Sequence, residues 1–250
     1  MCGIAGFNIA DGDVGKIDAQ RLARMLLLEI QARGRHATGA AWIRRDRDTG
    51  EMNVWYAKRP GPATAFMPVI DNVPRACRNV VLHTRYATQG SPKIEANNHP
   101  IVVPGVVGVH NGHISNDDEI IAAYGGERTG EVDSEAAFRL IAGSADTLAE
   151  LPRLQGRVAL GWIKVDAPRT LHLARLTGSP LAIGQTAEGS TVFASTRELL
   201  STGCRLAGVT LDFVTEVDEM TYLRVQKGMI HEWQPLGVKK PVDRQGVLFT

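Results

Sequence analysis

The sequence predicts an α+β fold in which antiparallel strands surround a helical insert. Short apolar segments alternate with turns at the start of the chain and return between residues 158 and 233. Between them, apolar residues recur at the three- and four-residue spacing of amphipathic helices. Elements grouped in this way pack as layers of sheet and helix around a hydrophobic core.

The first third of the chain is expected to form four strands and one long helix. Asp18 is a good N-cap for a helix that runs to about Arg33 and stops at Gly34, because its carboxylate can accept a free N–H group of the first turn. Turn residues 48–50 separate the second and third strands. The strands are expected at residues 3–9, 40–43, 52–57 and 80–86.

The middle of the chain is polar at first and then helical. Residues 89–100 are rich in turn-forming residues and indicate a loop, and a strand over residues 106–110 is expected to end at Asn111-Gly112. Helices are expected to begin at residue 115 or 116, at residue 133 or 134, and at residue 147. The last strands are expected at residues 158–165, 170–176, 180–184, 191–194, 219–225 and 229–233.

Composition excludes several classes of protein. The 250 residues include 44% hydrophobic and 22% charged residues, which argues against disorder. The 28 basic and 27 acidic residues leave a net charge of +1, so there is no electrostatic reason to expect a nucleic acid or a membrane as partner. The apolar stretches are too short to span a bilayer, and the first residues do not resemble a secretory signal.

The cysteines favour a reducing compartment. Cys2, Cys77 and Cys204 are scattered, have no CxxC spacing and are too few for a disulfide scaffold. We therefore expect a cytoplasmic protein. Cys77 and Cys204 are interpreted as small buried hydrophobic residues.

Cys2 is the first candidate for chemistry, because removal of Met1 would expose it as the N-terminal residue. Its thiol and its α-amine would then lie within a few bonds of each other. An α-amine titrates near pH ~7.7–8.0, so it can take the thiol proton and serve as the base. The alternative interpretation is a small apolar residue at the start of a strand.

A series of segments in a fixed order resembles the glutaminase domain of the class II glutamine amidotransferases, the N-terminal nucleophile type. Residues 2–6 resemble the opening of that family after Met removal, and residues 83–90 resemble its H-T-R-[WY]-A-T-x-G segment. Tyr86 matches the purine-type members and residues 177–181 the aminosugar type, so the subfamily stays open. The other matching segments are residues 97–100, 110–114, 132–135 and 194–196.

The resemblance implies a fold, a domain and an activity. The fold is a four-layer αββα sandwich of two antiparallel sheets between helices, over a domain of residues 2–236 with a tail at 237–250. The activity is hydrolysis of the side-chain amide of L-glutamine to glutamate and ammonia through a thioester on Cys2. No cofactor is expected, and no set of residues has convincing metal-ligand spacing.

Asn111 and Gly112 match the family's oxyanion donors. Amide hydrolysis passes through a tetrahedral oxyanion, and loss of one donor to such an oxyanion costs about 2.7–4 kcal/mol. The Asn side chain and the Gly backbone N–H would supply the two donors. Taken alone, Asn-Gly would instead favour a hairpin turn.

The resemblance also assigns residues that bind the substrate. Arg85 would hold the α-carboxylate of glutamine and Asp133 its α-ammonium, which would select a free amino acid. The alternatives are a surface arginine and an ordinary helix N-cap at Asp133, with Ser134 able to take over the capping. Tyr86 and Thr88 belong to the segment expected to bind and cover the substrate.

Two residues are expected to support the site, and one position departs from the family pattern. Arg33 matches an arginine that lies near the nucleophile, and His99 is interpreted as structural, holding the loop that closes over glutamine. His36 stands where the family commonly has Asp, which puts the local support of the site in doubt.

The ammonia acceptor is not apparent in the sequence. Family members usually carry a synthase domain after the glutaminase, whereas residues after about 234 offer only a short tail with Lys239, Lys240 and Asp243. We therefore expect a separate synthase partner or a free-standing glutaminase, with homo-oligomerisation left open. Two other functions stay open: an amidase for another amide or γ-glutamyl substrate, and a non-catalytic glutamine-binding module.

Overall fold

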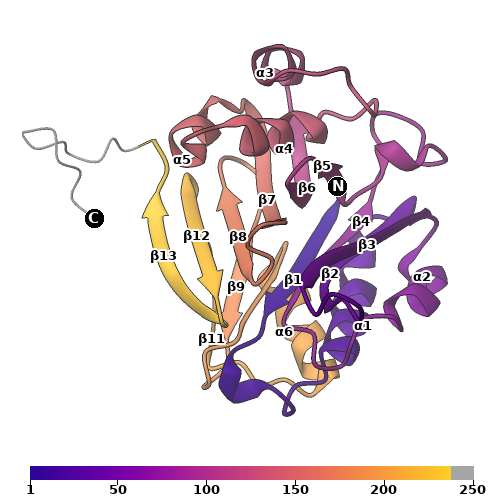
Figure 1. Cartoon of the computed structure of the whole chain (residues 1–250), viewed down its shortest axis with the longest axis vertical. Coiled ribbons are helices and arrows are strands. Elements are labelled where there is room, and N and C mark those ends of the chain that lie inside the picture. Colours follow the sequence, from indigo (N-terminus) through magenta and orange to yellow (C-terminus); the bar gives the residue numbers. More distant parts are fainter. Residues whose placement is uncertain (238–250) are drawn as a thin grey trace, which may run out of the picture.

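Two antiparallel sheets form the centre of the computed structural model, which describes residues 1–237 (Figure 1). The first sheet has seven strands in the order β11-β9-β10-β1-β4-β2-β3. Its strands are β1 (Gly3–Asn8), β2 (Ala37–Arg45), β3 (Met52–Pro60), β4 (Asn79–Arg85), β9 (Ala182–Gln185), β10 (Thr191–Ala194) and β11 (Phe213–Glu216).

The second sheet has six strands in the order β13-β12-β8-β7-β6-β5. It contains the two strands that follow the loop at residues 89–100 and those strands of the second half of the chain that do not belong to the first sheet. Its strands are β5 (Ile101–Val103), β6 (Val106–Ile114), β7 (Gly156–Lys164), β8 (Thr170–Arg175), β12 (Thr221–Gln226) and β13 (Met229–Pro235).

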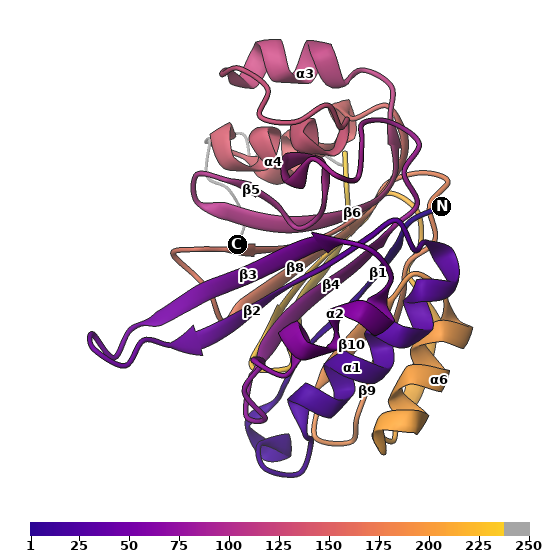
Figure 2. The ribbon, with the colours of Figure 1, turned by 90° about the vertical axis from the view of Figure 1, so that its right-hand side faces the viewer.

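Helices cover the outer face of each sheet (Figure 2). The first sheet carries α1 (Ala19–Ile30), α2 (Ala63–Ile70) and α6 (Arg197–Ala207), and the second carries α3 (Asp117–Tyr124), α4 (Ser134–Gly143) and α5 (Thr147–Glu150). This arrangement of helix, sheet, sheet and helix confirms the predicted α+β sandwich. None of the helices in residues 1–237 is long and apolar enough to cross a membrane.

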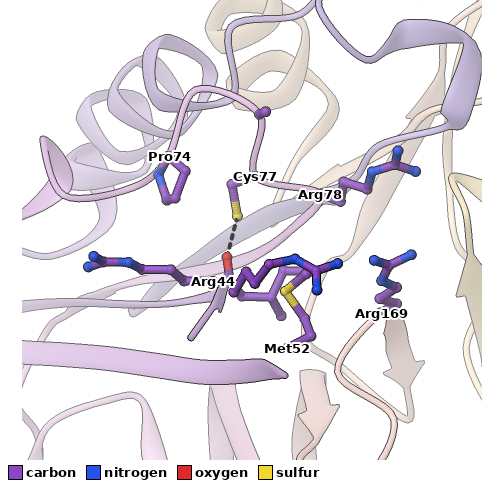
Figure 3. Close-up of a pocket in the computed structure, with 9 residues that line it drawn as sticks. Arg44, Met52, Pro74, Cys77, Arg78 and Arg169 are labelled. Carbon is purple, nitrogen blue, oxygen red and sulfur yellow. Dashed lines mark hydrogen bonds between the residues drawn. The ribbon is translucent and has the colours of Figure 1, made fainter. Parts of the chain in front are cut away.

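A hollow of about 300 Å³ lies at the end of the first sheet away from Cys2, beside the last residues of β2 and the first of β4 (Figure 3). Ile43, Met52 and Cys77 give it an apolar lining. Arginines surround the same hollow, among them Arg78 and Arg169, which lie near each other. The two ends of this sheet therefore each place a cysteine beside a cavity.

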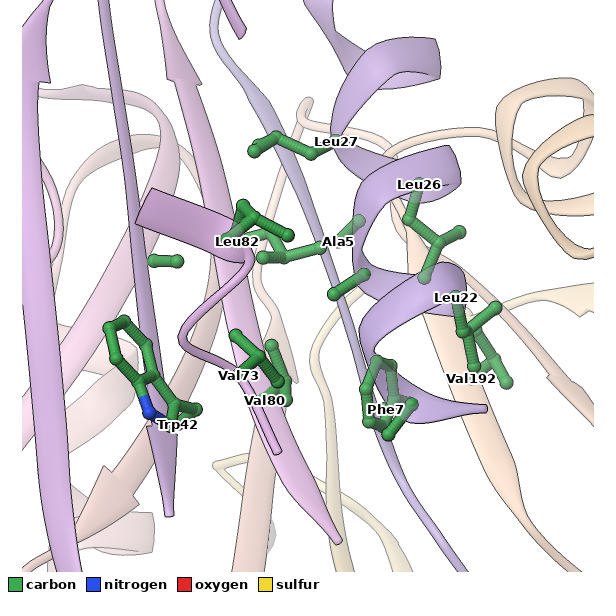
Figure 4. Packing of buried hydrophobic residues seen from close by; sticks show 14 of the residues in the cluster. Ala5, Phe7, Leu22, Leu26, Leu27, Trp42, Val73, Val80, Leu82 and Val192 are labelled. Carbon is green, nitrogen blue, oxygen red and sulfur yellow. The ribbon is translucent and has the colours of Figure 1, made fainter. Parts of the chain in front are cut away.

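Period-two alternation along β1 divides its side chains between two cores. Ile4 points into the core between the sheets, whereas Ala5 and Phe7 face the helices. Figure 4 shows Leu22 and Leu26 of α1 packed over this outer face. Full burial of a side chain such as Leu or Phe contributes about 1.5–3 kcal/mol, so this packing fixes the strand that begins directly after Cys2.

Most of the expected elements are confirmed, and four were missed: the short elements α2, β5 and β11, and the 11-residue helix α6. The buried face of α6 consists of Leu200, Gly203 and Cys204. A Cβ at Gly203 would lie 2.8 Å from Leu26 Cδ2, so this glycine allows α6 to approach α1 closely. The helix is capped at Thr196, whose side chain accepts the N–H of Leu199.

The predicted end of a strand at Asn111-Gly112 was wrong. β6 continues to Ile114, and both residues pair with β7, Asn111 with Ala159 and Gly112 with Val158. The predicted loop at residues 89–100 is confirmed apart from one 3₁₀ turn at Glu95–Asn97. The predicted tail, including Lys239, Lys240 and Asp243, lies outside the described residues except for Gly237.

Candidate active site

Cys2 is half-buried in the wall of a cavity of about 360 Å³. Its thiol donates a hydrogen bond to the carbonyl oxygen of Tyr86 at 3.7 Å. Arg33, at the end of the 3₁₀ turn that follows α1, donates through Nε to the Cys2 carbonyl oxygen at 2.7 Å. The cavity is lined by Met1, Cys2, Tyr86, Thr88, Gln89, Asn111, Gly112, His113, Arg157 and Ser179.

The electrostatic surroundings of Cys2 act in opposite directions. Burial raises the pKa of its thiol, and Asp133 acts in the same direction. The N-terminal ammonium and Arg85 favour the thiolate and lower the pKa. Because the net pKa is raised, this thiol needs a nearby base to become a nucleophile near neutral pH.

Asn111 lines the same cavity and carries an amide donor without a partner among residues 1–237. Its side chain is buried, and Nδ2 has no hydrogen-bond partner among residues 1–237. Buried amide groups are nearly always paired, so an unpaired Nδ2 on a residue that lines the cavity suits a ligand oxygen. The dipeptide Asn111-Gly112 is not a hairpin turn, since β6 runs through it.

Gly112 is required by the backbone at this point. Its φ is +147°, and a Cβ would overlap the carbonyl oxygen of Arg157. Only glycine fits such a position, where the neighbouring strand passes this close. The strand register therefore brings Asn111 and Gly112, both of which line the cavity, opposite Ala159 and Val158 of β7.

Arg85 lies beside the cavity but is already occupied by protein acceptors. It is 3% exposed and donates to Asn98 Oδ1 and to the Gly90 carbonyl, both at 2.9 Å, and also to the Gln89 carbonyl. These contacts tie the start and the end of the loop at residues 89–98 together. Its predicted role as a carboxylate clamp stays a prediction.

Asp133 occupies the N-cap position of α4, yet its side chain makes no capping bond. Oδ2 instead accepts the N–H of Ile114 at 2.6 Å and lies 3.4 Å from Nδ1 of His113. Ser134 does not cap the helix either, because its hydroxyl contacts Nδ1 of His110 at 2.8 Å. The ordinary N-cap interpretation is therefore wrong, and the carboxylate is directed toward β6.

Three histidines form a buried cluster behind Cys2 and Arg85. His99 stacks on His83 with 4.0 Å between ring centroids, and His83 Nε2 lies 3.1 Å from the His110 carbonyl oxygen. Burial lowers the pKa of His83 to about 3 and that of His99 well below its usual value, so both are neutral. His99 thus packs beneath the site, while the loop itself is held by Arg85 and by Lys58, which donates to the Asn98 carbonyl at 2.9 Å.

His36 supports the segment that covers Cys2. Its Nδ1 accepts the backbone N–H of Ala87 at 2.9 Å, and its ring lies 5.0 Å from that of Tyr86. The imidazole therefore supplies an acceptor to the residue that follows the Tyr86 carbonyl. The segment is therefore supported by His36 itself, although this position departs from the family pattern.

Three cavity residues received no role from the sequence: His113, Arg157 and Ser179. His113 and Ser179 lie within matched segments, but Arg157 lies in none, and only the pairing of β6 with β7 brings it opposite His113. Within the part of the chain that the structure describes, no three His, Cys, Asp or Glu side chains gather as a metal site would require.

Comparison with known proteins identifies the domain. Residues 83–202 match the family model of the glutamine amidotransferase domain. A glutamine--fructose-6-phosphate aminotransferase (isomerizing) from Symbiobacterium thermophilum is 32% identical over 208 residues, 78% of this chain and 31% of the relative. One from Rhizobium meliloti is 34% identical over 195 residues, 74% of this chain and 30% of the relative. The chain thus spans about a third of the length of these curated relatives.

Solved structures agree on the fold. Glutamine phosphoribosylpyrophosphate amidotransferase from B. subtilis, complexed with ADP and GMP, superposes with a TM-score of 0.73 at 19% identity, covering 94% of this chain and 49% of that one. A structure described as the allosteric regulatory enzyme of purine biosynthesis gives 0.72 at 18% identity, with the same coverage. The sequence matches, together with the shared sandwich, support a glutamine amidotransferase domain of the class II, N-terminal nucleophile type in this chain.

Proposed function

We propose that this domain hydrolyses the side-chain amide of L-glutamine to glutamate and ammonia, with Cys2 as the nucleophile. The observation that carries the proposal is that Cys2 and Asn111 line one cavity and that Asn111 Nδ2 has no hydrogen-bond partner among residues 1–237. A thiol supplies the attacking atom, and a free buried amide supplies a donor for the oxyanion that the attack creates.

The reaction requires removal of Met1, which is 63% exposed and lines the same cavity. The α-amine of Cys2 then takes the thiol proton as the sulfur attacks the amide carbon. Because this amine lies within a few bonds of the sulfur, it can deprotonate the thiol even though the thiol pKa is raised. Arg33 holds the Cys2 carbonyl, which fixes the backbone that carries both groups.

The tetrahedral intermediate carries its negative charge on the former amide oxygen. Asn111 Nδ2 and the backbone N–H of Gly112 donate to this oxygen. Collapse breaks the carbon–nitrogen bond, and the α-ammonium returns its proton to the leaving ammonia. Water then attacks the thioester, with the α-amine again taking a proton, and glutamate leaves as the thiol forms again.

Recognition of the free amino acid falls to the charged groups around the cavity. Asp133 accepts the α-ammonium of glutamine, with Tyr86 and Thr88 forming part of the wall over the substrate. Asp133 also lies close enough to influence the pKa values of both Cys2 and Arg85, which supports a place near the reacting centre.

Comparison of the wild-type protein with Cys2→Ala tests the chemistry. We expect release of glutamate and ammonia from glutamine by the wild-type protein and a loss of several orders of magnitude in the variant. Intact mass should show that Met1 is absent from the active protein. Equal activity of the two proteins, or full activity with Met1 retained, would contradict the proposal; glutamine binding without turnover would favour the binding module.

We also propose that the ammonia serves a synthase partner. The support is indirect: the relatives named above are an aminotransferase of fructose 6-phosphate and a phosphoribosylpyrophosphate amidotransferase. Affinity purification from the source cells should recover a protein that changes the rate of glutamine hydrolysis. If the isolated protein turns over glutamine at full rate and no recovered protein alters it, the domain acts as a free-standing glutaminase.

A further inference from the structure

Positive charge gathers on an apolar lining in the hollow at the end of the first sheet away from Cys2 (Figure 3). Among the described residues that line this arginine hollow, none is acidic and four are basic: Arg44, Arg45, Arg78 and Arg169. Ile43 and Cys77, which are buried, belong to the same lining. A cleft that combines charge of one sign with apolar walls focuses the electric field and attracts ions of the opposite sign.

Two buried asparagines hold the backbone that carries one of these arginines. Arg169 lies in the turn between β7 and β8 of the second sheet, whereas Arg78 directly precedes β4 of the first sheet. Asn8 Nδ2 donates to the Arg169 carbonyl oxygen at 2.9 Å, and Asn79 Nδ2 donates to the carbonyls of the residues on either side of it, at 2.9 and 3.1 Å. These side chains fix a turn of one sheet against the other and keep Arg169 near Arg78.

The guanidinium groups differ in how far protein partners already use them. Arg78 forms an ion pair with Asp11, and Cζ of Arg44 lies 5.3 Å from the centroid of the Trp55 ring. Arg169 is exposed and takes part in none of the ion pairs within residues 1–237. Its forked N–H donors therefore have no carboxylate partner in this part of the chain.

Asp11 shows how this group of cations acts on a carboxylate. The ion pair with Arg78 lowers the pKa of Asp11, and Lys227 and Arg169 act in the same direction. Asp11 does not line the hollow, and 63% of its side chain is exposed. One carboxylate thus faces three cations, which leaves an excess of positive charge for a ligand.

We propose that the arginine hollow binds a small organic molecule that carries a phosphate group. Its arginines come from three segments, the end of β2, the residue before β4 and the residue before β8. Several guanidinium groups from separate segments suit a tetrahedral anion with many oxygen atoms, whereas one arginine suffices for a planar carboxylate. The volume of about 300 Å³ is at the lower end of small-molecule sites, and the apolar lining would contact the organic part.

The ligand is expected to be small, and its site is separate from the Cys2 cavity. A net charge of +1 gives no broad basic surface for a nucleic acid. The two cavities share no lining residue in the part of the chain that the structure describes. Phosphate binding at the hollow is therefore independent of glutamine hydrolysis at Cys2, and a failure of either leaves the other intact.

Calorimetry with phenyl phosphate, inorganic phosphate and benzoate at constant ionic strength tests the chemistry of the ligand. We expect saturable binding of phenyl phosphate. Inorganic phosphate should bind more weakly because it lacks an apolar part, and benzoate most weakly because its anion is a planar carboxylate. The assignment is overturned if phenyl phosphate does not bind, or if either of the other two anions binds as tightly.

Arg169→Met removes the charge and keeps most of the stem. It should weaken phenyl phosphate binding about 10- to 100-fold, the size of a lost charge-assisted contact, while Arg169→Lys should lose less. Arg157→Met, at an exposed arginine on the Cys2 cavity, is the matched control and should keep the wild-type affinity. Unchanged affinity in Arg169→Met, or an equal loss in Arg157→Met, would show that the ligand lies elsewhere.

Phenylglyoxal labelling tests the location without a substitution. The reagent modifies accessible guanidinium groups, so bound phenyl phosphate should slow the labelling of Arg169 and leave that of Arg157 unchanged, as read by peptide mass spectrometry. Thermal unfolding verifies that each variant used for calorimetry is folded. Equal labelling of Arg169 with and without phenyl phosphate would overturn the site in the native protein.

Discussion

The two ends of the first sheet both place a cysteine beside a cavity with arginines, yet only one end is equipped for nucleophilic chemistry. Cys2 is half-buried in the wall of a cavity that is also lined by Asn111, whose Nδ2 has no hydrogen-bond partner among residues 1–237. Cys77 is buried, its thiol donates to the Ile43 carbonyl at 3.2 Å, and burial raises its pKa to about 12 (Figure 3).

Nearby positive charge does not by itself activate a thiol. Arg44, Arg45, Arg78 and Arg169 line the Cys77 cavity, yet burial raises the pKa of the thiol, and what opposes burial is backbone hydrogen bonding rather than arginine charge. At Cys2 the burial also raises the thiol pKa, and the difference lies in the proposed base on the same residue and in the Asn111 amide donor, which has no partner among residues 1–237. The comparison teaches that free donors mark the reactive end more clearly than arginines do.

The largest effect is expected from Gly112→Ala, which adds one methyl group to the oxyanion site. The Cβ would overlap the Arg157 carbonyl on a backbone that only glycine adopts easily, so β6 and β7 must separate. We expect loss of glutaminase activity and a decrease of more than about 4 kcal/mol in the free energy of unfolding. Denaturant unfolding and a glutaminase assay measure the two effects.

Gly105→Ala is the control for that substitution. Gly105 also has a positive φ, +80°, but a Cβ there meets no atom within 4 Å. Its cost should be the backbone strain alone, about 1–2 kcal/mol, with activity retained. Equal effects of the two substitutions would show that the close approach of β7 to Gly112 is unimportant.

Asn111→Ala should separate activity from stability. Removing one oxyanion donor lowers kcat about 10²–10³-fold in other hydrolases, and we expect a similar fall here with little change in KM. Because Nδ2 has no partner to lose within residues 1–237, the free energy of unfolding should change by less than about 1 kcal/mol. A stability loss as large as the activity loss would make Asn111 a structural residue.

Local patterns predicted most of the fold because they report local physics. Alternation and turn residues identified the longer strands, and Asp18 capped α1 as expected by accepting the N–H of Arg21. α2 was missed because it contains Pro68, which normally ends a helix, whereas α6 repeats Leu200, Cys204 and Ala207 at helical spacing and could have been predicted from that pattern.

The same distinction between local and long-range information applies to the candidate site. Ordered motifs predicted the residues that the structure brings into one cavity, among them Cys2, Asn111 and Gly112. They did not predict Arg157, because its place depends on the register between β6 and β7, which no short segment encodes. They also did not predict that Asp133 accepts the N–H of Ile114, a contact across 19 positions of the chain.

Acid is expected to destabilise the end of the first sheet that carries Cys2, because buried histidines lie there. The other end carries arginines, whose guanidinium groups do not titrate. His83 is neutral in the folded protein down to its pKa of about 3, whereas an unfolded histidine binds a proton near pH ~6.5. The unfolded state therefore binds more protons between these values, and stability falls as the pH is lowered from about 6.5 toward 3, by up to about 1.4 kcal/mol per unit.

His83→Asn removes this titrating group. We expect the unfolding free energy, measured at pH 7, 6 and 5, to fall less steeply with decreasing pH in the variant than in the wild-type protein. The two slopes should differ by the contribution of up to one bound proton, about 1.4 kcal/mol per pH unit. The other histidines titrate in both proteins, so the difference isolates His83. Identical slopes would mean that His83 is charged in the folded state or is not buried as described.

The smallest effect is expected at the other cysteine. Cys77→Ala removes a buried thiol whose hydrogen bonds go to the carbonyls of Ile43 and Asn79, which should cost about 1–2 kcal/mol of stability and leave kcat and KM for glutamine unchanged. Iodoacetamide should alkylate the native protein at Cys2 while Cys77 stays unmodified, because a buried thiol with a pKa of about 12 holds almost no thiolate near neutral pH. Fast alkylation of Cys77, or a loss of activity in Cys77→Ala, would erase the contrast between the two ends of the sheet. Without that contrast, the free donor at Asn111 would no longer suffice to identify the reactive cysteine.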